Sequence, residues 1–354
     1  MQTSKRLAVL GLAVLCLYLA AVSGWGERLR QSALTRIDEG RMRNVTVLEE
    51  SGDPPSDPPA ALPEIPAAEA VAAMLARAEE DGELPMRVLE SVSPEEIRET
   101  TIQGGLSLKN ETGYAVDVPE LLRRGPSLRL PAEGPQILIV HTHGSEAYTP
   151  SGLDRYEAND NRRTADGNFS VIRVGDELAA ILEEAGLRVL HDREIYDFPS
   201  YTGSYTRSGE AVERYLAEYP EIAVVLDIHR DALGSDGVVY KTMAEEEGTV
   251  ASQIMLLCGT DESGLQHPDW RENLALALYL QQRVSMRHPT LMRPVSLVPQ
   301  RYNQHLTRGS LIVEVGSSGN TLQEALSAIR LFGEAAAPAL AELAEGAGED
   351  SSNS

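Results

Sequence analysis

Between Gln136 and Phe332, short apolar runs alternate with longer segments in which apolar side chains recur at helical spacing. Short continuous apolar runs are typical of strands buried on both faces. The runs fall at residues 137–140, 187–190, 223–228, 254–258 and 310–315. Helical spacing occurs over 171–182, 208–219, 271–286 and 321–332. The alternation predicts an α/β fold, a single layered domain with a mostly parallel central sheet flanked by helices.

Helix ends are indicated by single residues at fixed positions. Gly186 suits the C-cap of the first helix, and Thr321 with Glu324 forms a capping box for the last. Ser208 is expected to N-cap a helix that Pro220 ends.

The N-terminus carries an apolar run of 19 residues without a charge, from Leu7 to Trp25, after Lys5 and Arg6. A helix of this length measures about 28 Å, enough to cross a bilayer once. Residues 21–23 (AVS) would also serve as the cleavage site of a signal peptide. The length of the run and Trp25 at its edge favour an uncleaved signal anchor. Either interpretation places the rest of the chain outside the cytoplasm.

The remaining chain divides by composition. Residues 27–134 are expected to form a Pro-rich and acidic stalk with a partly ordered end, because proline stiffens the chain and removes hydrogen-bond donors. The signal anchor then occupies 1–26, a catalytic domain 135–345, and a disordered tail 346–354.

Charge and cysteine content exclude several classes of protein. The chain has 31 basic and 54 acidic residues, a net charge of −23, which repels the phosphates of nucleic acids. Cys16 and Cys258 are too few for a disulfide framework or a Cys-rich zinc module. A metal site would therefore have to use histidines and carboxylates.

Such residues follow three of the predicted strands. His141, His143 and Glu146 come after residues 137–140, His229 follows 224–228, and Glu314 lies within SLIVEVG. Ligands of open α/β sheets bind beyond the carboxyl ends of strands. Imidazole and carboxylate groups bind zinc, which lowers the pKa of a bound water. Glu314 is the candidate catalytic residue, because a buried carboxylate can accept the proton of that water.

Each residue also has an ordinary structural explanation. An H-x-H pair can be a hydrogen-bonded surface pair, His229 a capped core histidine, and Glu314 half of an ion pair with arginine. Their combination favours the metal site. The sequence has no Gly-x-Ser-x-Gly elbow and no glycine-rich phosphate loop, and Cys258 fits the core. Tyr148, Tyr201 and Tyr205 could contact a sugar or a peptide, although packing is the usual role of such residues.

Five blocks cover most of residues 136–335 in order: ILIVHTHGSEAYTP, VIRVGDELAAIL, YTGSYTRSGEAVERYL, VVLDIHRDAL and LIVEVGSSGNTLQEA. Together they resemble the stage II sporulation protein P family. The resemblance implies a zinc-dependent N-acetylmuramoyl-L-alanine amidase with cross-link endopeptidase activity, acting on peptidoglycan of the septum during engulfment. It also implies a single-pass cell-membrane protein with an extracytoplasmic catalytic domain, and stage II sporulation proteins D and M as partners.

The resemblance assigns roles by position. It implies zinc binding by His229 and by His143 or His141, and a catalytic Glu314. The family is related to zinc-dependent amidases with an α/β fold, which carry a zinc-binding Glu at the start of their first helix. At the corresponding place this chain has residues 170–173 (SVIR), without a carboxylate. Glu146 is the expected substitute, with the other histidine of the pair as the alternative third ligand.

Substrate contacts are expected from Arg207, Arg230, Tyr148 and Tyr205, with ion pairing the alternative for the arginines. Two other functions remain open: a metal-dependent deacetylase or esterase, and a non-catalytic scaffold that binds the cell wall.

Overall fold

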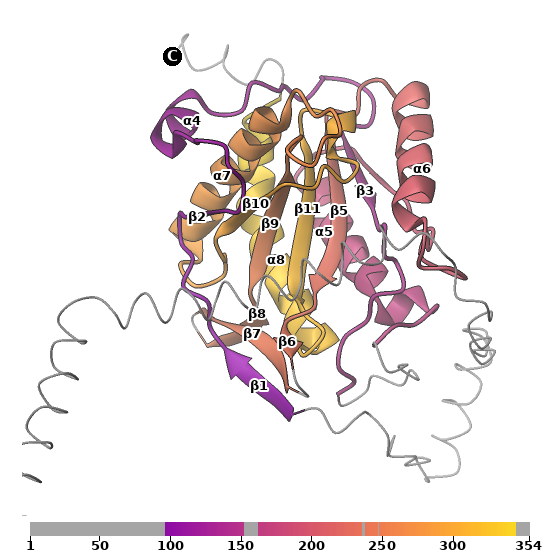
Figure 1. Ribbon diagram of the computed structural model, residues 1–354, viewed down its shortest axis with the longest axis vertical. Helices are drawn as coiled ribbons and strands as arrows, with labels where there is room; N and C mark the ends of the chain where they lie inside the picture. Colours follow the sequence, from indigo (N-terminus) through magenta and orange to yellow (C-terminus); the bar gives the residue numbers. More distant parts are fainter. Residues whose placement is uncertain (1–95, 152–161, 236–237, 247, 345–354) are drawn as a thin grey trace, which may run out of the picture. The chain divides into compact units, whose positions relative to one another are not determined.

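A central seven-stranded sheet organises the part of the chain that this computed structural model describes, residues 96–151, 162–235, 238–246 and 248–344 (Figure 1). The strand order is β2-β10-β9-β11-β5-β3-β4, and only β11 and β9 pair antiparallel among these described neighbours. The predicted α/β fold with a mostly parallel sheet is therefore confirmed. The strands are β2 (Leu108–Asn110), β3 (Ile137–Val140), β4 (Val189–His191), β5 (Val224–Asp231), β9 (Ile254–Gly259), β10 (Val295–Val298) and β11 (Ser310–Ser317).

Helices cover both faces of this sheet. One face packs against α5 (Val171–Glu184), α7 (Trp270–Arg287) and α8 (Leu322–Ala341). The other packs against α6 (Ser204–Glu218). The short helix α4 (Val118–Arg124) contacts α7, and two 3₁₀ turns lie at Gly167–Phe169 and Gln304–Leu306.

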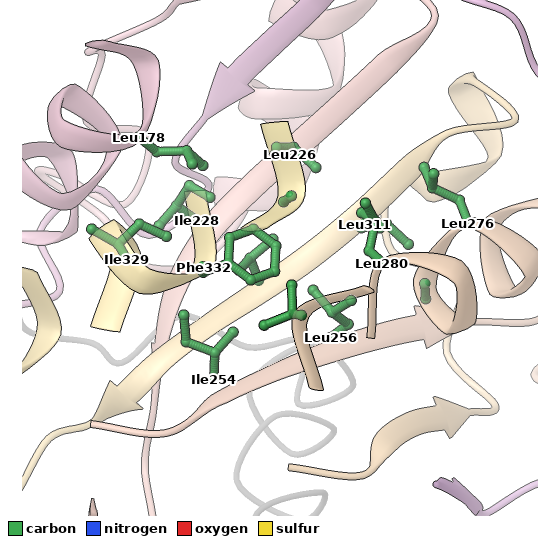
Figure 2. Packing of buried hydrophobic residues seen from close by; sticks show 14 of the residues in the cluster. Leu178, Leu226, Ile228, Ile254, Leu256, Leu276, Leu280, Leu311, Ile329 and Phe332 are labelled. Atoms are coloured by element: carbon green, nitrogen blue, oxygen red, sulfur yellow. The ribbon is translucent and has the colours of Figure 1, made fainter. Parts of the chain in front are cut away.

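Strand side chains alternate between the two faces, and this alternation decides where each polar residue lies. Figure 2 shows Leu226 and Ile228 of β5 packed near Ile329 and Phe332 of α8. Val225 of β5 points the other way, into the cluster against α6. The residues between the core positions near the ends of β5 and β11 therefore face the α6 side.

Three predicted helix ends are confirmed and one is wrong. Helix α6 ends at Glu218, shortly before Pro220 as predicted. Gly186 adopts φ +86° after α5, and Thr321 and Glu324 form the capping box of α8. Ser208 does not cap α6, which begins four residues earlier after Gly203, whose φ is +80°. Ser208 is instead buried within the helix, where its hydroxyl bonds Thr142.

A second, four-stranded sheet was not predicted. It comprises β1 (Glu96–Thr100), β6 (Gly234–Ser235), β7 (Val238–Glu246) and β8 (Thr249–Ser252), which lie below the central sheet in Figure 1. Asn320, which precedes α8, ties this sheet to the central one because it accepts from Thr242 N and donates to Thr242 O.

The N-terminal predictions fall largely on residues that are not described. The apolar run at 7–25 and the Pro-rich stretch at 51–66 lie outside the described residues. Within residues 96–134, β1, β2 and α4 contribute to the sheets and helix layers above. None of the described helices is both long and apolar enough to cross a membrane.

Candidate active site

The carboxyl ends of β3, β5 and β11 meet at one edge of the central sheet, and the predicted polar residues gather there. The three strands are parallel neighbours, with Val140 opposite Asp227 and Glu314 opposite His229. Because paired residues point to the same face, His229 and Glu314 lie side by side on the α6 face. His143, Glu146, His229 and Glu314 are each at most 6% exposed.

His229 lies among acidic groups. Its Nδ1 is 3.4 Å from Glu146 Oε2 and its Nε2 is 3.0 Å from Asp227 Oδ1. The His143 ring stands edge-on to the His229 ring, with the centroids 5.2 Å apart. The structure therefore brings His143, Glu146 and His229 together.

His141 lies on the other side of the strand. Its Nε2 is 2.8 Å from His191 Nε2, and its Nδ1 is 3.2 Å from the Ile228 carbonyl oxygen. Gly175 of α5 makes room for this pair, since a Cβ there would come within 2.6 Å of His141 Nε2 and 2.7 Å of His191 Nε2. Of the two histidines in the pair, His143 is therefore the one that contacts His229.

The cluster is strongly charged. Glu146 accepts a hydrogen bond from Arg230 N and pairs with Arg163 at 3.3 Å. Burial acts to raise the pKa of Glu146, but His229, Arg230 and Arg163 outweigh it and hold that pKa well below its ordinary value. The carboxyl group of Glu146 is therefore ionised.

The two histidines respond in opposite ways to the same surroundings. Burial lowers the pKa of His143 well below its ordinary value. Burial also opposes charge on His229, but Asp227 and Glu146 raise its pKa well above the ordinary value. A positive charge is thus stabilised between Asp227 and Glu146, which is the electrostatic condition that a cation site requires.

These residues fit zinc as a donor set. Two imidazoles and one ionised carboxylate are zinc ligands, and three protein ligands leave one position for water. The Nδ1 atom of His143 is buried and makes no hydrogen bond to any described residue. No group of three His, Cys, Asp or Glu side chains within the described ranges is already arranged as a coordination shell.

The two arginines expected to contact substrate both donate hydrogen bonds to backbone carbonyl oxygens. Arg207 donates to the carbonyl oxygens of Tyr196, Ser200 and Thr202. Arg230 is 5% exposed and donates to the carbonyl oxygens of Ala147 and Arg162. Both arginines therefore hold the loops that surround the site.

The two expected tyrosines differ. Tyr148 is fully buried in the core and donates to the Val315 carbonyl oxygen. Tyr205 is half-buried and lies edge-on to His143, with ring centroids 5.3 Å apart. Tyr205 thus borders the site, whereas Tyr148 belongs to the hydrophobic core.

Three further residues, for which no role was predicted, contact the cluster. Asp227 precedes His229 by two positions, so strand alternation alone places both on one face. Asp197 accepts from Ser145 N and Ser145 Oγ and pairs with Arg163. Nothing in the sequence indicates these contacts of Asp197 and Arg163, since both residues lie in loops.

Comparison with known proteins gives a family match over most of the chain. A family model described as stage II sporulation protein P (SpoIIP) matches residues 68–337. Stage II sporulation protein P of Bacillus subtilis (strain 168) is 26% identical over 202 residues. That match covers 53% of this chain and 47% of the relative, so it spans about half of the relative's length.

Among solved structures, the chain is similar to the N-acetylmuramoyl-L-alanine amidase AmiC2 of Nostoc punctiforme, with a TM-score of 0.33 and 17% identity. This match covers 60% of the chain and 96% of AmiC2. The N-acetylmuramyl-L-alanine amidase Ami1 of Mycobacterium smegmatis gives a TM-score of 0.34 and 11% identity, over 60% of the chain and 99% of Ami1. Likeness at this level transfers no residue role.

Proposed function

Because the chain belongs to the stage II sporulation protein P family, we propose that it is a zinc-dependent peptidoglycan hydrolase. Its reaction would be that of an N-acetylmuramoyl-L-alanine amidase, with cross-link endopeptidase activity as a second reaction. One observation carries the proposal: the ends of three parallel strands bring His143, Glu146 and His229 together beside Glu314.

His143, Glu146 and His229 would hold the zinc ion. When bound, zinc supplies the Lewis acidity that activates water and polarises an amide carbonyl. Asp227 and Glu146 favour a positive charge at His229, and a bound cation would meet the same electrostatic demand. Arg163 and Arg230 N keep Glu146 oriented toward His229.

Glu314 would move the proton. It lies beside His229 but belongs to β11, whereas the three proposed zinc ligands come from β5 and from the segment after β3. Glu314 is therefore close to the proposed zinc site without being one of its ligands. A carboxylate at this position accepts the proton of the attacking water on Oε and delivers it to the leaving amine. Burial of Glu314 limits exchange of that proton with bulk solvent.

Aromatic rings form the border of the site. Tyr201 stacks on His143 with a centroid distance of 4.5 Å, and Tyr302 lies 5.3 Å from Tyr205. Tyrosine rings present apolar faces and a polar edge, which suits contact with glycan and stem peptide. The rings of Tyr205 and Tyr302 are the proposed contacts with peptidoglycan.

The remaining elements of the proposal concern location and partners. We place the protein in the septal cell membrane, anchored through residues 7–25, with the catalytic domain outside the cytoplasm. Stage II sporulation proteins D and M are the proposed partners. The order of an apolar run, a Pro-rich segment and the α/β domain supports this arrangement.

The decisive experiment uses the full-length chain in detergent with purified sacculi. Wild-type protein should release stem peptides, and a chelator should stop the release until zinc is restored. Glu314→Gln should bind zinc as the wild type does and lose about 10²- to 10⁴-fold in rate, the usual contribution of a general acid–base.

The matched control is Glu334→Gln, which changes an exposed glutamate on α8 and should leave the rate unchanged. Full activity in chelator would exclude the metal mechanism, and a fully active Glu314→Gln would remove Glu314 from the reaction. Products in which the stem peptides stay attached would favour a deacetylase or esterase. Zinc-free protein that binds sacculi without cutting them would favour a scaffold.

A further inference from the structure

In both His143 and His229, the Nε2 atom lies close to an oxygen atom of a neighbouring side chain. The Nε2 of His143 is 3.1 Å from the Tyr201 hydroxyl, and the Nε2 of His229 is 3.0 Å from Asp227 Oδ1. We propose that Tyr201 and Asp227 are positioning residues that hold these Nε2 atoms, so that each histidine offers Nδ1 to the metal. This inference rests on the proposed zinc site and specifies how that site is built.

The Nδ1 atom of His229 faces the third proposed ligand, and the Nδ1 atom of His143 is buried without a hydrogen bond to the part of the chain that the structure describes. His229 Nδ1 is 3.4 Å from Glu146 Oε2. His143 Nδ1 makes no hydrogen bond to any described residue, and the Asp197 carboxylate is 3.9 Å away, beyond hydrogen-bond reach. A metal binds the unprotonated ring nitrogen, and the other nitrogen then carries a hydrogen that needs an acceptor. Tyr201 and Asp227 are the acceptors within reach.

Asp227 is suited to this task because its position is fixed. Oδ1 accepts from Thr142 N at 2.8 Å and Oδ2 from Thr142 Oγ1 at 2.6 Å. Thr142 Oγ1 is in turn bonded to Ser208 Oγ of α6 at 2.8 Å. The His229 Nε2 and Asp227 Oδ1 atoms are at ion-pair distance but are not aligned as a hydrogen bond. When a metal binds Nδ1, the hydrogen on Nε2 would give Asp227 Oδ1 a donor to accept from.

Asp227 also connects the two ligands. Thr142 immediately precedes His143, and Asp227 precedes His229 by two residues on the next strand. The bonds from Asp227 to Thr142 thus fix the end of β3 relative to β5. Loss of the Asp227 carboxylate should disturb both histidines at once.

Tyr201 is held equally firmly. Its ring stacks on the His143 ring with an angle of 16° between the two planes. The Arg163 guanidinium lies over the Tyr201 ring, 4.9 Å from the ring centroid. Arg207 fixes the loop through the carbonyl oxygens of Tyr196, Ser200 and Thr202. The Tyr201 hydroxyl is therefore presented to His143 by a braced loop.

The test measures zinc affinity of the full-length chain by competition with a chromophoric chelator. Asp227→Asn should weaken zinc binding about 10- to 100-fold, as loss of an outer carboxylate partner does. Tyr201→Phe removes one neutral hydrogen bond and should weaken binding about two- to tenfold. In ¹⁵N spectra of the zinc-loaded, histidine-labelled chain, Nδ1 of both histidines should be metal-bound and Nε2 protonated.

Controls separate this role from general folding effects. Ser310→Ala removes a buried hydroxyl at the start of β11, where it is bonded to Thr307, and should leave zinc affinity within about twofold of the wild-type value. Tyr219→Phe should do the same, because Tyr219 follows the C-terminal end of α6 and its hydroxyl is hydrogen-bonded to Glu218. If Asp227→Asn does not fold, Tyr201→Phe and the wild-type spectrum decide the matter.

The outcomes are distinguishable from failure of the proposed function. Wild-type protein that binds no zinc would overturn the metal centre and this inference together. Zinc bound through either Nε2 would overturn the inference alone, as would unchanged affinity in both Asp227→Asn and Tyr201→Phe.

Discussion

The ion pair between Asp231 and Arg293 allows a quantitative test of the structure. Arg293 Nη1 is 2.8 Å from Asp231 Oδ2, and the side chains are 5% and 0% exposed. Asp231 ends β5, two residues after His229. Substitution Arg293→Met keeps most of the apolar stem but removes the charge, so the buried Asp231 carboxylate loses its ion pair with Arg293.

The expected loss follows from burial. Removing one partner of a buried ion pair typically costs about 3 to 5 kcal/mol, because the remaining charge is uncompensated in a low-dielectric interior. A domain of this size loses about 2 to 4 °C in Tm for each kcal/mol. Arg293→Met should therefore lower the Tm by about 6 to 20 °C.

Thermal and urea unfolding at pH 7 measure this loss. Arg308→Met is the matched control, since Arg308 and Asp269 are 61% and 42% exposed at 3.3 Å, and such surface pairs contribute less than about 1 kcal/mol. The double variant Asp231→Asn with Arg293→Met should recover part of the loss, because no buried charge remains unpaired. An Arg293→Met protein no less stable than the Arg308→Met protein would refute the reasoning.

Two further predictions concern buried titratable groups. Burial, with His305 and Arg301 nearby, lowers the pKa of His267 to about 4. Between pH 6.5 and 4 the unfolded chain binds more protons than the folded chain, so the free energy of unfolding should decrease as the pH is lowered. In urea titrations, His267→Asn should remove up to about 3 kcal/mol of that decrease. A pH dependence unaltered in His267→Asn would contradict this. Burial also raises the pKa of the Cys258 thiol. In a Cys16→Ser background, a thiol reagent at pH 8 should therefore label Cys258 only after denaturation, and rapid labelling of folded protein would disprove its burial.

Five of the seven strands of the central sheet were predicted from apolar runs, whereas β2 and β10 were not. Apolar runs such as Ile137–Val140 have few alternatives to a buried strand, and every strand predicted from such a run appears in the sheet, with boundaries shifted by a few residues. The second sheet was missed for the opposite reason. In β7 (Val238–Glu246) buried positions are interspersed with partly exposed ones, and polar residues occur at both, so the strand contains no continuous apolar run. Its attachment to the central sheet also depends on Asn320, a distant loop residue.

The grouping of the site was predictable from the rule that strand ends meet, whereas its internal geometry was not. Strand alternation places His141 with Ile137 and Ile139 on the α5 face, but it says nothing of His143, which lies beyond the end of β3. Sequence also offers no means of seeing that Arg207 is occupied by three backbone carbonyls. Its partners belong to a loop whose path depends on the whole fold.

The position of β11 has a consequence for the order in which the protein can form. This strand is the last of the described strands along the chain, yet it lies between β9 and β5 in the middle of the sheet. Until it is inserted, β2-β10-β9 and β5-β3-β4 are separate halves with exposed edges. Glu314 arrives on the same strand. A chain that is still being synthesised, or that has been truncated before Ser310, therefore lacks both the joined sheet and the proposed catalytic carboxylate. The proposed hydrolase activity would then begin only when the domain is complete.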